Sequence, residues 1–159
     1  MKVGILTISD RSFNHIRPDE GGPALASIIH EKKWVIIAQE IIPDEQSEIK
    51  KCLIHWADQK HIDLILTTGG TGLGPRDVTP EATIEVLEKQ LPGLVELMRR
   101  EGLKETPFSV LSRALAGIRG ESIIINFPGN PEGAKKSLRL ILPLLEHAHQ
   151  MILGHDHTK

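Results

Sequence analysis

Three short runs of almost continuous apolar residues set the tightest limit on how this chain can fold. They span residues 2–9, 34–42 and 62–68, and each ends in a polar or glycine-rich loop. Strands that are covered on both faces have this character, because polar side chains on either face would be buried. The runs therefore predict strands of a mainly parallel sheet with helices on both of its faces.

Segments with helical periodicity lie between and after these runs. After a polar loop over residues 10–22, Pro23 is expected to open the first helix. The positions i, i+3, i+4 and i+7 from Ile49 to Trp56 are apolar, which predicts an amphipathic helix with Cys52 in the core. Three more helices are predicted. Thr79 is expected to cap the first, the second contains Leu94, Leu97 and Met98, and the third begins at Thr106 and Pro107.

The C-terminal part of the chain predicts a hairpin followed by a long helix. Only three residues separate the predicted strands 115–118 and 122–127, a link too short for a parallel crossover. Asn130 is then expected to cap the final helix, and Pro143 to kink it. A second apolar row on this helix indicates either a wide buried front or a subunit contact; it consists of Leu140, Leu144 and Met151.

Composition narrows the class of ligand. The chain has 19 basic and 21 acidic side chains, no basic block, three Phe, two Trp and no Tyr, which argues against a nucleic-acid partner. The 159 residues suit one domain over residues 1–159, without an internal repeat. A single cysteine and the lack of a long apolar segment predict a cytoplasmic protein with no membrane partner. His155 and His157 are read as part of a frayed terminus rather than a metal site.

The most unusual segments all follow predicted strands. They are residues 9–11, 43–45, 69–77 and 128–130. In open parallel sheets, ligands bind outside the carboxyl ends of the strands, so we expect these segments to border one site. The ligand of that site is expected to be small.

The glycine-dense segment 69–74 indicates close contact between the backbone and an anion. Four of its six residues are glycine, so backbone N–H groups can approach a phosphate, and a helix start follows. The segment lacks the Lys-Ser/Thr pair of a P-loop and the spacing of a dinucleotide fingerprint. Taken alone, the glycines indicate a tight turn equally well.

Two carboxylates favour the phosphate interpretation. Asp77 follows the glycines, and Asp44 follows the second strand. Because a carboxylate repels phosphate, the pair suggests a Mg²⁺ ion between them, although Asp44 could equally cap a helix that starts at Glu45. Ser9 and Ser112 could bind ligand oxygens, or only end a strand or helix. Three arginines could clamp phosphates or lie on the solvated surface: Arg76, Arg113 and Arg119.

The order of these motifs resembles the MogA/MoaB family of molybdenum-cofactor biosynthesis. The central segment, residues 67–82 (TTGGTGLGPRDVTPEA), carries most of the resemblance. Residues 42–46 (IPDEQ) and 125–131 (INFPGNP) are more similar to the MogA type and to the eukaryotic gephyrin-type G domains than to the MoaB type. The resemblance spans the whole chain, with further matches at residues 8–11 (ISDR) and 111–120 (LSRALAGIRG). Gly74 departs from many relatives, which carry a larger or polar residue there.

The resemblance implies a three-layer α/β/α sandwich, a homotrimer, and molybdopterin adenylyltransferase activity with Mg²⁺ and the substrates ATP and molybdopterin. It implies that Asp44 and Asp77 are the essential catalytic acids, and our hypothesis is that Asp77 helps hold the metal while Asp44 supports the site. It also implies a molybdenum insertase partner that takes the product. The substrate-binding residues that it implies are Ser9, Asp10, Gly69, Gly70, Thr71, Gly72, Ser112, Gly129 and Asn130. A MoaB-type paralogue and a trimeric pterin-binding or scaffolding module remain the alternatives.

Overall fold

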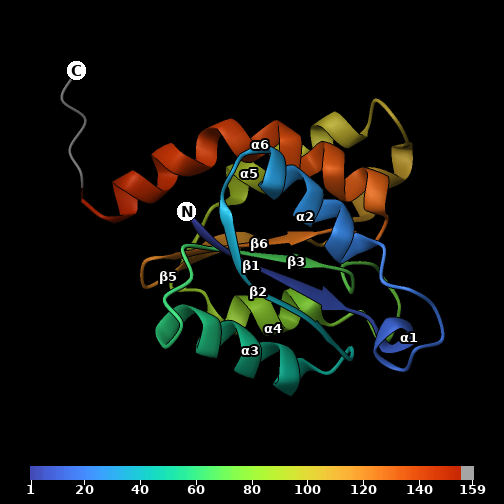
Figure 1. Cartoon of the computed structure of the whole chain (residues 1–159). Coiled ribbons are helices and arrows are strands. Elements are labelled where there is room, and N and C mark those ends of the chain that lie inside the picture. Colours follow the sequence, from blue (N-terminus) through green and yellow to red (C-terminus); the bar gives the residue numbers. More distant parts are fainter. Residues whose placement is uncertain (155–159) are drawn as a thin grey trace.

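A computed structural model describes residues 1–154 of the chain and contains one six-stranded sheet with the strand order β2-β1-β3-β6-β5-β4 (Figure 1). The histidines at 155 and 157 lie outside the described residues, so that prediction stays open. The strands are β1 (Lys2–Ile8), β2 (Val35–Ile42), β3 (Leu64–Thr68), β4 (Lys89–Gln90), β5 (Ala116–Arg119) and β6 (Ser122–Phe127).

The sheet is mixed, as predicted. Strands β2, β1, β3 and β6 run parallel to one another. Strand β5 pairs antiparallel with β6 and with the two-residue strand β4, which the sequence did not reveal. The carboxyl ends of β1, β2, β3 and β6 therefore meet at one edge of the sheet, and the loops that follow them are neighbours.

Helices cover both faces of the sheet, which confirms the three-layer α/β/α arrangement (Figure 1). Helices α2 (Gly21–Glu31), α5 (Pro92–Gly102) and α6 (Pro131–Ile152) lie on one face; α3 (Gln46–Asp58) and α4 (Thr79–Val86) lie on the other. Each face of the sheet has its own hydrophobic core. Successive residues of β1 point to opposite faces, so Ile5 packs into the first core, under α2, α5 and α6, and Leu6 into the second, under α3 and α4. Both faces of β1 are therefore buried, as its apolar run predicts.

The segment predicted as a polar loop over residues 10–22 contains a short helix, α1 (Asp10–Phe13). Ser9 caps it by accepting a hydrogen bond from the amide of Ser12 at 3.2 Å. Helix α2 begins at Gly21 rather than at Pro23, and the Asp19 carboxylate accepts a hydrogen bond from the amide of Gly22 at 3.0 Å. Local capping by Ser9 and Asp19 thus adds helix on both sides of the expected loop.

Thr79 does not cap helix α4, contrary to the prediction. The cap position is Val78, and Thr79 is the first helical residue. The Thr79 hydroxyl is fully buried and donates to the carbonyl oxygen of Gly69 at 2.9 Å. The Thr79 hydroxyl therefore holds the glycine loop against the start of α4.

The final helix keeps one apolar row buried and leaves part of the second row exposed. Asn130 caps α6 by accepting from the amide of Gly133 at 2.8 Å, as predicted, and the helix continues through Pro143. Ala134, Leu138, Ile141 and Leu145 are buried in the first core, whereas Leu144 and Met151 are 46% and 58% exposed. Leu140 is partly buried against the first core, so a wide buried front is wrong only for Leu144 and Met151.

Two further observations bear on the predictions from composition. Cys52 is only partly buried at the edge of the second core, and burial raises the pKa of its thiol to about 12. Among residues 1–154, every helix is too short or too polar to cross a bilayer.

Candidate active site

A cleft of about 1460 Å³ opens at the carboxyl ends of the parallel strands. Single small-molecule sites usually measure about 300–1,000 Å³, so this cleft has room for two ligands of that size. All eleven site residues that were predicted line it: Ser9, Asp10, Asp44, Gly69, Gly70, Thr71, Gly72, Asp77, Ser112, Gly129 and Asn130. The structure thus brings together five segments that are far apart in the sequence.

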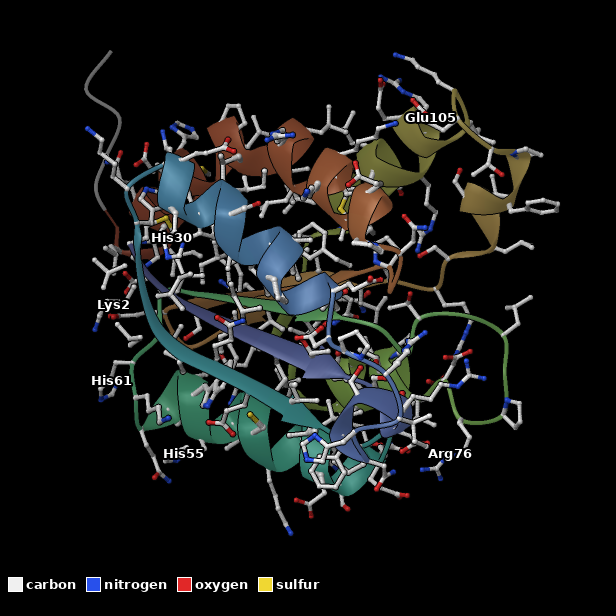
Figure 2. All side chains as sticks on the ribbon, turned by 45° about the vertical axis from the view of Figure 1, so that its right-hand side comes forward. Lys2, His30, His55, His61, Arg76 and Glu105 are labelled. Atoms are coloured by element: carbon white, nitrogen blue, oxygen red, sulfur yellow. The ribbon has the colours of Figure 1, made fainter. Side chains whose placement is uncertain are left out.

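Two unlike walls enclose the cleft. We call the loops that follow β1, β2 and β3 the strand-end wall, and the part formed by α5, the 3₁₀ helix η1 (Pro107–Leu111) and α6 the helical wall. Figure 2 shows Arg76 of the strand-end wall and Glu105 of the helical wall on the same side of the molecule. The apolar part of the helical wall consists of Val95, Met98, Phe108, Leu111 and Leu140.

The sequence did not reveal the helical wall. Phe108 is 73% exposed and Leu111 is 48% exposed, and neither side chain belongs to a helical or strand-like apolar pattern. The available signal was the Thr-Pro helix start at Thr106, where the Thr106 hydroxyl accepts a hydrogen bond from the amide of Phe108 at 3.3 Å. Apolar side chains just after such a start, without a buried partner, mark a surface that faces a ligand or solvent.

The glycine loop adopts a backbone that only glycine takes readily. Gly69 has φ = +100° and Gly70 has φ = +65°. A Cβ atom at Gly69 would collide with the carbonyl oxygen of Ile8, and one at Gly70 would collide with the Thr79 hydroxyl. The glycines are therefore required for the path of this loop, which leaves β3 and passes between Ile8 of β1 and Thr79 of α4.

Four consecutive amides of this loop are available for an anion. The N–H groups of Gly70, Thr71, Gly72 and Leu73 donate no hydrogen bond within the described residues 1–154. These residues line the cleft, and successive free amides beside left-handed glycines form a concave anion-binding site. We call these four amides the phosphate cradle. Their geometry supports the predicted anion site, which the number of glycines alone did not establish.

Asp44 does not cap helix α3, so that alternative is wrong. Helix α3 begins at Gln46, and its cap residue Glu45 makes no side-chain capping bond. The Asp44 carboxylate instead accepts from the amide of Asp10 at 2.7 Å, and the Asp10 carboxylate accepts from the amide of Asp44 at 3.0 Å. This reciprocal pair joins the ends of β1 and β2.

The two members of the pair differ in charge environment. Burial raises the pKa of the Asp44 carboxyl, and the negative charges of Asp10 and Asp77 add to that rise. Hydrogen bonds from Arg76 lower the pKa of the Asp10 carboxyl. Arg76 is exposed and donates to Asp10 at 3.0 and 3.2 Å and to Glu45 at 2.8 Å, so its charge is balanced within the strand-end wall.

Asp77 closes a small turn at the rim of the cleft. One carboxylate oxygen, Oδ2, accepts from the amide of Gly74 at 2.8 Å, and the Asp77 amide donates to the Gly74 carbonyl at 3.0 Å. The other oxygen of Asp77 accepts no hydrogen bond from residues 1–154, and the same is true of Oδ1 of Asp44. Each of the two acids therefore has one oxygen left for a ligand.

Some of the remaining polar residues cap helices or brace loops, and others can still bind a ligand. The side-chain oxygens of Ser9 and Asn130 cap α1 and α6, whereas the Ser112 hydroxyl accepts only a long bond from the Ala114 amide at 3.3 Å and can still donate. Of the three arginines considered as phosphate clamps, only Arg76 lines the cleft. Arg119 binds Asp58 and the carbonyl of Val86, and Arg113 binds the back of the glycine loop.

Comparisons with known proteins agree with this geometry. Residues 4–147 match the family described as a probable molybdopterin binding domain. A molybdopterin adenylyltransferase from Helicobacter pylori is 42% identical over 154 residues, which cover 96% of this chain and 88% of the relative. The molybdenum cofactor synthesis protein cinnamon from Drosophila melanogaster is 42% identical over 150 residues, which cover 94% of this chain and 25% of that longer protein.

Solved structures give the same result. The molybdopterin biosynthesis enzyme MoaB from Thermus thermophilus superposes with a TM-score of 0.91 at 50% identity, covering 96% of both chains. The molybdopterin biosynthesis Mog protein from Mycobacterium ulcerans gives a TM-score of 0.89 at 34% identity, covering 95% of this chain and 98% of that one. With a sheet shared with these structures and a family match that spans the glycine loop and both acids, this chain belongs to the molybdopterin-binding domain family of molybdenum-cofactor biosynthesis.

Proposed function

We propose that this protein is a molybdopterin adenylyltransferase, which transfers AMP from ATP to the terminal phosphate of molybdopterin and releases pyrophosphate. One observation carries the proposal: the four amides of residues 70–73, unpartnered within residues 1–154, and the two acids Asp44 and Asp77 line a single cleft with room for two ligands. A relative of that name at 42% identity over nearly the whole chain supports it.

The chemistry requires two anions to meet. An oxygen of the terminal molybdopterin phosphate attacks the α-phosphorus of ATP, the new P–O bond forms, and the bond from that phosphorus to the bridging oxygen of pyrophosphate breaks. The electron pair leaves with pyrophosphate, so negative charge builds on the departing oxygens. Fixed N–H donors directed at such charge stabilise the transition state without having to reorganise.

The chain's own residues contribute alignment and hydrogen bonds. The amides of Gly70, Thr71, Gly72 and Leu73 bind phosphate oxygens, and the Ser112 hydroxyl donates to a further oxygen. Holding both phosphates in near-attack geometry removes much of the entropic barrier, an effect of about 7–11 kcal/mol in well-oriented systems. The apolar side chains of the helical wall, such as Phe108 and Leu111, bind the ring portion of a substrate.

The donor set suits Mg²⁺ carried with the nucleotide. No cluster of three or more His, Cys, Asp or Glu side chains that could cage a metal occurs in residues 1–154. Mg²⁺ commonly takes only one or two carboxylates and completes its shell with phosphate and water, and Asp44 and Asp77 each offer one unpaired oxygen. Held by these two acids, the ion would neutralise phosphate charge.

The direct test is an adenylylation assay. Purified protein, molybdopterin and Mg-ATP are expected to yield adenylyl-molybdopterin and pyrophosphate in equal amounts. Asp77→Asn should abolish turnover while the protein stays folded and keeps binding the pterin. Glu121→Gln, which neutralises an exposed acid in the β5–β6 turn, is the matched control and should retain full activity. Near-normal turnover by Asp77→Asn would exclude the assigned role of that carboxylate.

A second candidate is a MoaB-type paralogue, or a trimeric pterin-binding or scaffolding module, with little adenylation activity. The 50% identity to a protein titled MoaB favours it, as does 38% identity to a gephyrin from Dictyostelium discoideum over 92% of this chain and 22% of that protein. Tight binding of molybdopterin without formation of the adenylylated product would support this candidate over the first.

The assembly and setting belong to the same proposal. We propose a homotrimer in the cytoplasm that passes adenylyl-molybdopterin to a molybdenum insertase. The exposed side chains of Leu144 and Met151 lie seven residues apart on α6, so they share one face of the helix and offer an apolar surface for a subunit contact. Sedimentation equilibrium of the purified protein would measure the number of subunits.

A further inference from the structure

We propose that Arg113 is a positioning residue: it fixes the glycine loop and Asp77 from behind and does not touch either substrate. The inference deepens the proposed adenylyl transfer and rests on it for its catalytic half. Arg113 was considered above as a phosphate clamp, and the structure gives it a different task.

The contacts of Arg113 are concentrated on one stretch of chain. Its Nε donates to the carbonyl of Gly72 at 2.8 Å, and its Nη2 donates to the carbonyl of Asp77 at 2.7 Å. Both Nη atoms also donate to the carboxylate of Glu81, in the first turn of α4. The Arg113 amide donates to the carbonyl of Thr71 at 3.0 Å. One residue therefore holds three carbonyl groups between positions 71 and 77 together with the start of the following helix.

These bonds leave the guanidinium little capacity for a substrate. All three of its nitrogens already donate to protein acceptors, and Arg113 is absent from the cleft lining. The hydrogen bond from Arg113 lowers the pKa of the Glu81 carboxyl, so at neutral pH the pair is charged and its opposite charges balance. A planar guanidinium suits this task because its donors form a rigid fork.

Fixing a carbonyl also fixes the amide that follows it. In a planar trans peptide the C=O of one residue and the N–H of the next point in opposite directions. Because the Arg113 backbone and side chain hold the carbonyls of Thr71 and Gly72, the amides of Gly72 and Leu73 must point the other way. Those two amides are among the four that donate no hydrogen bond inside the described residues 1–154. Arg113 thereby orients half of the phosphate cradle.

The same residue sets the place of the acid at the rim. The carbonyl of Asp77 is tied to Arg113, while the Asp77 carboxylate and amide are tied to Gly74. Without Arg113 the turn 74–77 loses its fixed attachment to the rest of the site, and its two internal bonds, which involve the amides of Gly74 and Asp77, open more often. A displacement of about 1 Å in such a group can reduce turnover about 100-fold.

Arg119 provides a matched control within the same chain. It is also partly buried, donates to a backbone carbonyl, that of Val86 at 3.1 Å, and pairs with a carboxylate, that of Asp58. It lies outside the cleft lining. Arg119→Ala therefore removes a comparable set of structural bonds without releasing the glycine loop.

The experiment measures turnover and loop order together in Arg113→Ala, Arg113→Lys and Arg119→Ala, each assayed well below its own unfolding temperature. For Arg113→Ala we expect kcat to fall about 100-fold with KM for both substrates within about threefold, because alignment rather than binding is lost. Amide hydrogen exchange at Gly74 and Asp77, followed by NMR, should lose its protection. Arg119→Ala should change neither quantity.

Two further arms separate positioning from other roles. Added guanidinium ion should restore part of the kcat of Arg113→Ala, and Arg113→Lys should fall between wild type and Arg113→Ala because an ammonium group cannot reach all three acceptors. Unchanged kcat in Arg113→Ala would overturn the proposal. So would a raised KM with normal exchange at Gly74 and Asp77, since that combination indicates a direct substrate contact.

The outcome also separates this inference from the proposed function. If wild-type protein forms no adenylyl-molybdopterin, the proposed function fails. The exchange rates of the Gly74 and Asp77 amides would then support or overturn the positioning role of Arg113 without reference to activity.

Discussion

The two walls of the cleft are built by different physical means. The strand-end wall is polar and heavily cross-linked, with the Asp10–Asp44 pair, the Arg76 bridge and the Thr79 hydroxyl all acting within a few residues of the sheet edge. The helical wall presents exposed apolar side chains such as Phe108 and Leu111. It is joined to the other wall by the segment that carries Ser112 and Arg113.

The contrast suggests a division of labour. Groups that act on developing charge must be preorganised, and hydrogen-bonded strand ends provide that order. An apolar surface that binds a ring contributes equally to the ground state and the transition state, so it needs less precise placement. Substitutions in the strand-end wall should therefore affect turnover, whereas substitutions in the helical wall should affect substrate affinity.

The largest effect is expected from a methyl group added at Gly69. In Gly69→Ala the new Cβ collides with the carbonyl of Ile8 in a backbone at φ = +100°, so we expect a loss of about 2–4 kcal/mol in the free energy of unfolding. Turnover should fall at least about 100-fold, because the amides of the cradle move with the loop. Urea unfolding and the adenylylation assay measure the two effects.

The control for Gly69→Ala lies in α5, outside the cleft lining. Gly93 is near the start of α5, and a Cβ there meets nothing within 4 Å. Gly93→Ala should stabilise the fold by about 0.5–1 kcal/mol and leave kcat unchanged. Equal losses of turnover in the two variants would mean that the path of the glycine loop is not what lowers turnover in Gly69→Ala.

The sequence predicted the strand-end wall because that wall follows from topology. Residues such as Asp44 and Gly69 lie just after strands, and parallel strands bring their carboxyl ends to one edge. The partner of each group could not be predicted in the same way. That Asp44 binds the Asp10 amide rather than capping α3, and that Thr79 binds Gly69, depends on distances between loops that no local pattern encodes.

The helical wall could not be predicted for a related reason. Phe108 and Leu111 lie in a five-residue 3₁₀ helix, which is too short to show a period. Its position over the cleft depends on packing against α5, where Arg99 donates to the carbonyls of Ser112 and Ala114 at 2.8 Å. Such placement is set by tertiary contacts, and only the structure reveals it.

A second, smaller effect separates the two acids that bridge β1 and β2. Burial raises the pKa of Asp44, so its ionised form is less favourable in the folded than in the unfolded protein. The protonated carboxyl therefore favours folding at low pH, and this contribution is lost as the pH rises through the folded pKa. Asp44→Asn should therefore raise the melting temperature at pH 7 by about 1–2 °C in EDTA. Turnover should fall about 10–100-fold, because a ligand oxygen loses its charge.

Asp10→Asn is the matched comparison and should have the opposite sign. Arg76 lowers the pKa of Asp10, so this carboxylate stabilises the folded state above its unfolded pKa and loses that contribution as pH falls through the folded value. At pH 7 the melting temperature of Asp10→Asn should fall by about 1 °C, a small change because the pair is exposed. The difference from wild type should shrink as the pH falls through the lowered pKa of Asp10. Calorimetry from pH 3 to pH 7 measures both variants; shifts of the same sign would contradict the assignment.

The smallest effect is expected at Phe108, and it tests the helical wall most directly. Phe108 is 73% exposed, so Phe108→Ala should change the free energy of unfolding by no more than about 0.5 kcal/mol. A ring that stacks on a planar substrate contributes about 0.5–1.5 kcal/mol, which corresponds to a rise of about threefold to tenfold in KM with kcat unchanged.

Val110→Ala supplies the reference for Phe108→Ala, because Val110 is in the same 3₁₀ helix, is 52% exposed and does not line the cleft. Its KM and kcat should match those of wild type. A fall in kcat for Phe108→Ala at unchanged KM would mean that the aromatic ring acts on the transition state. The helical wall would then share the alignment of the phosphates, and the assignment of turnover to the strand-end wall alone would be wrong.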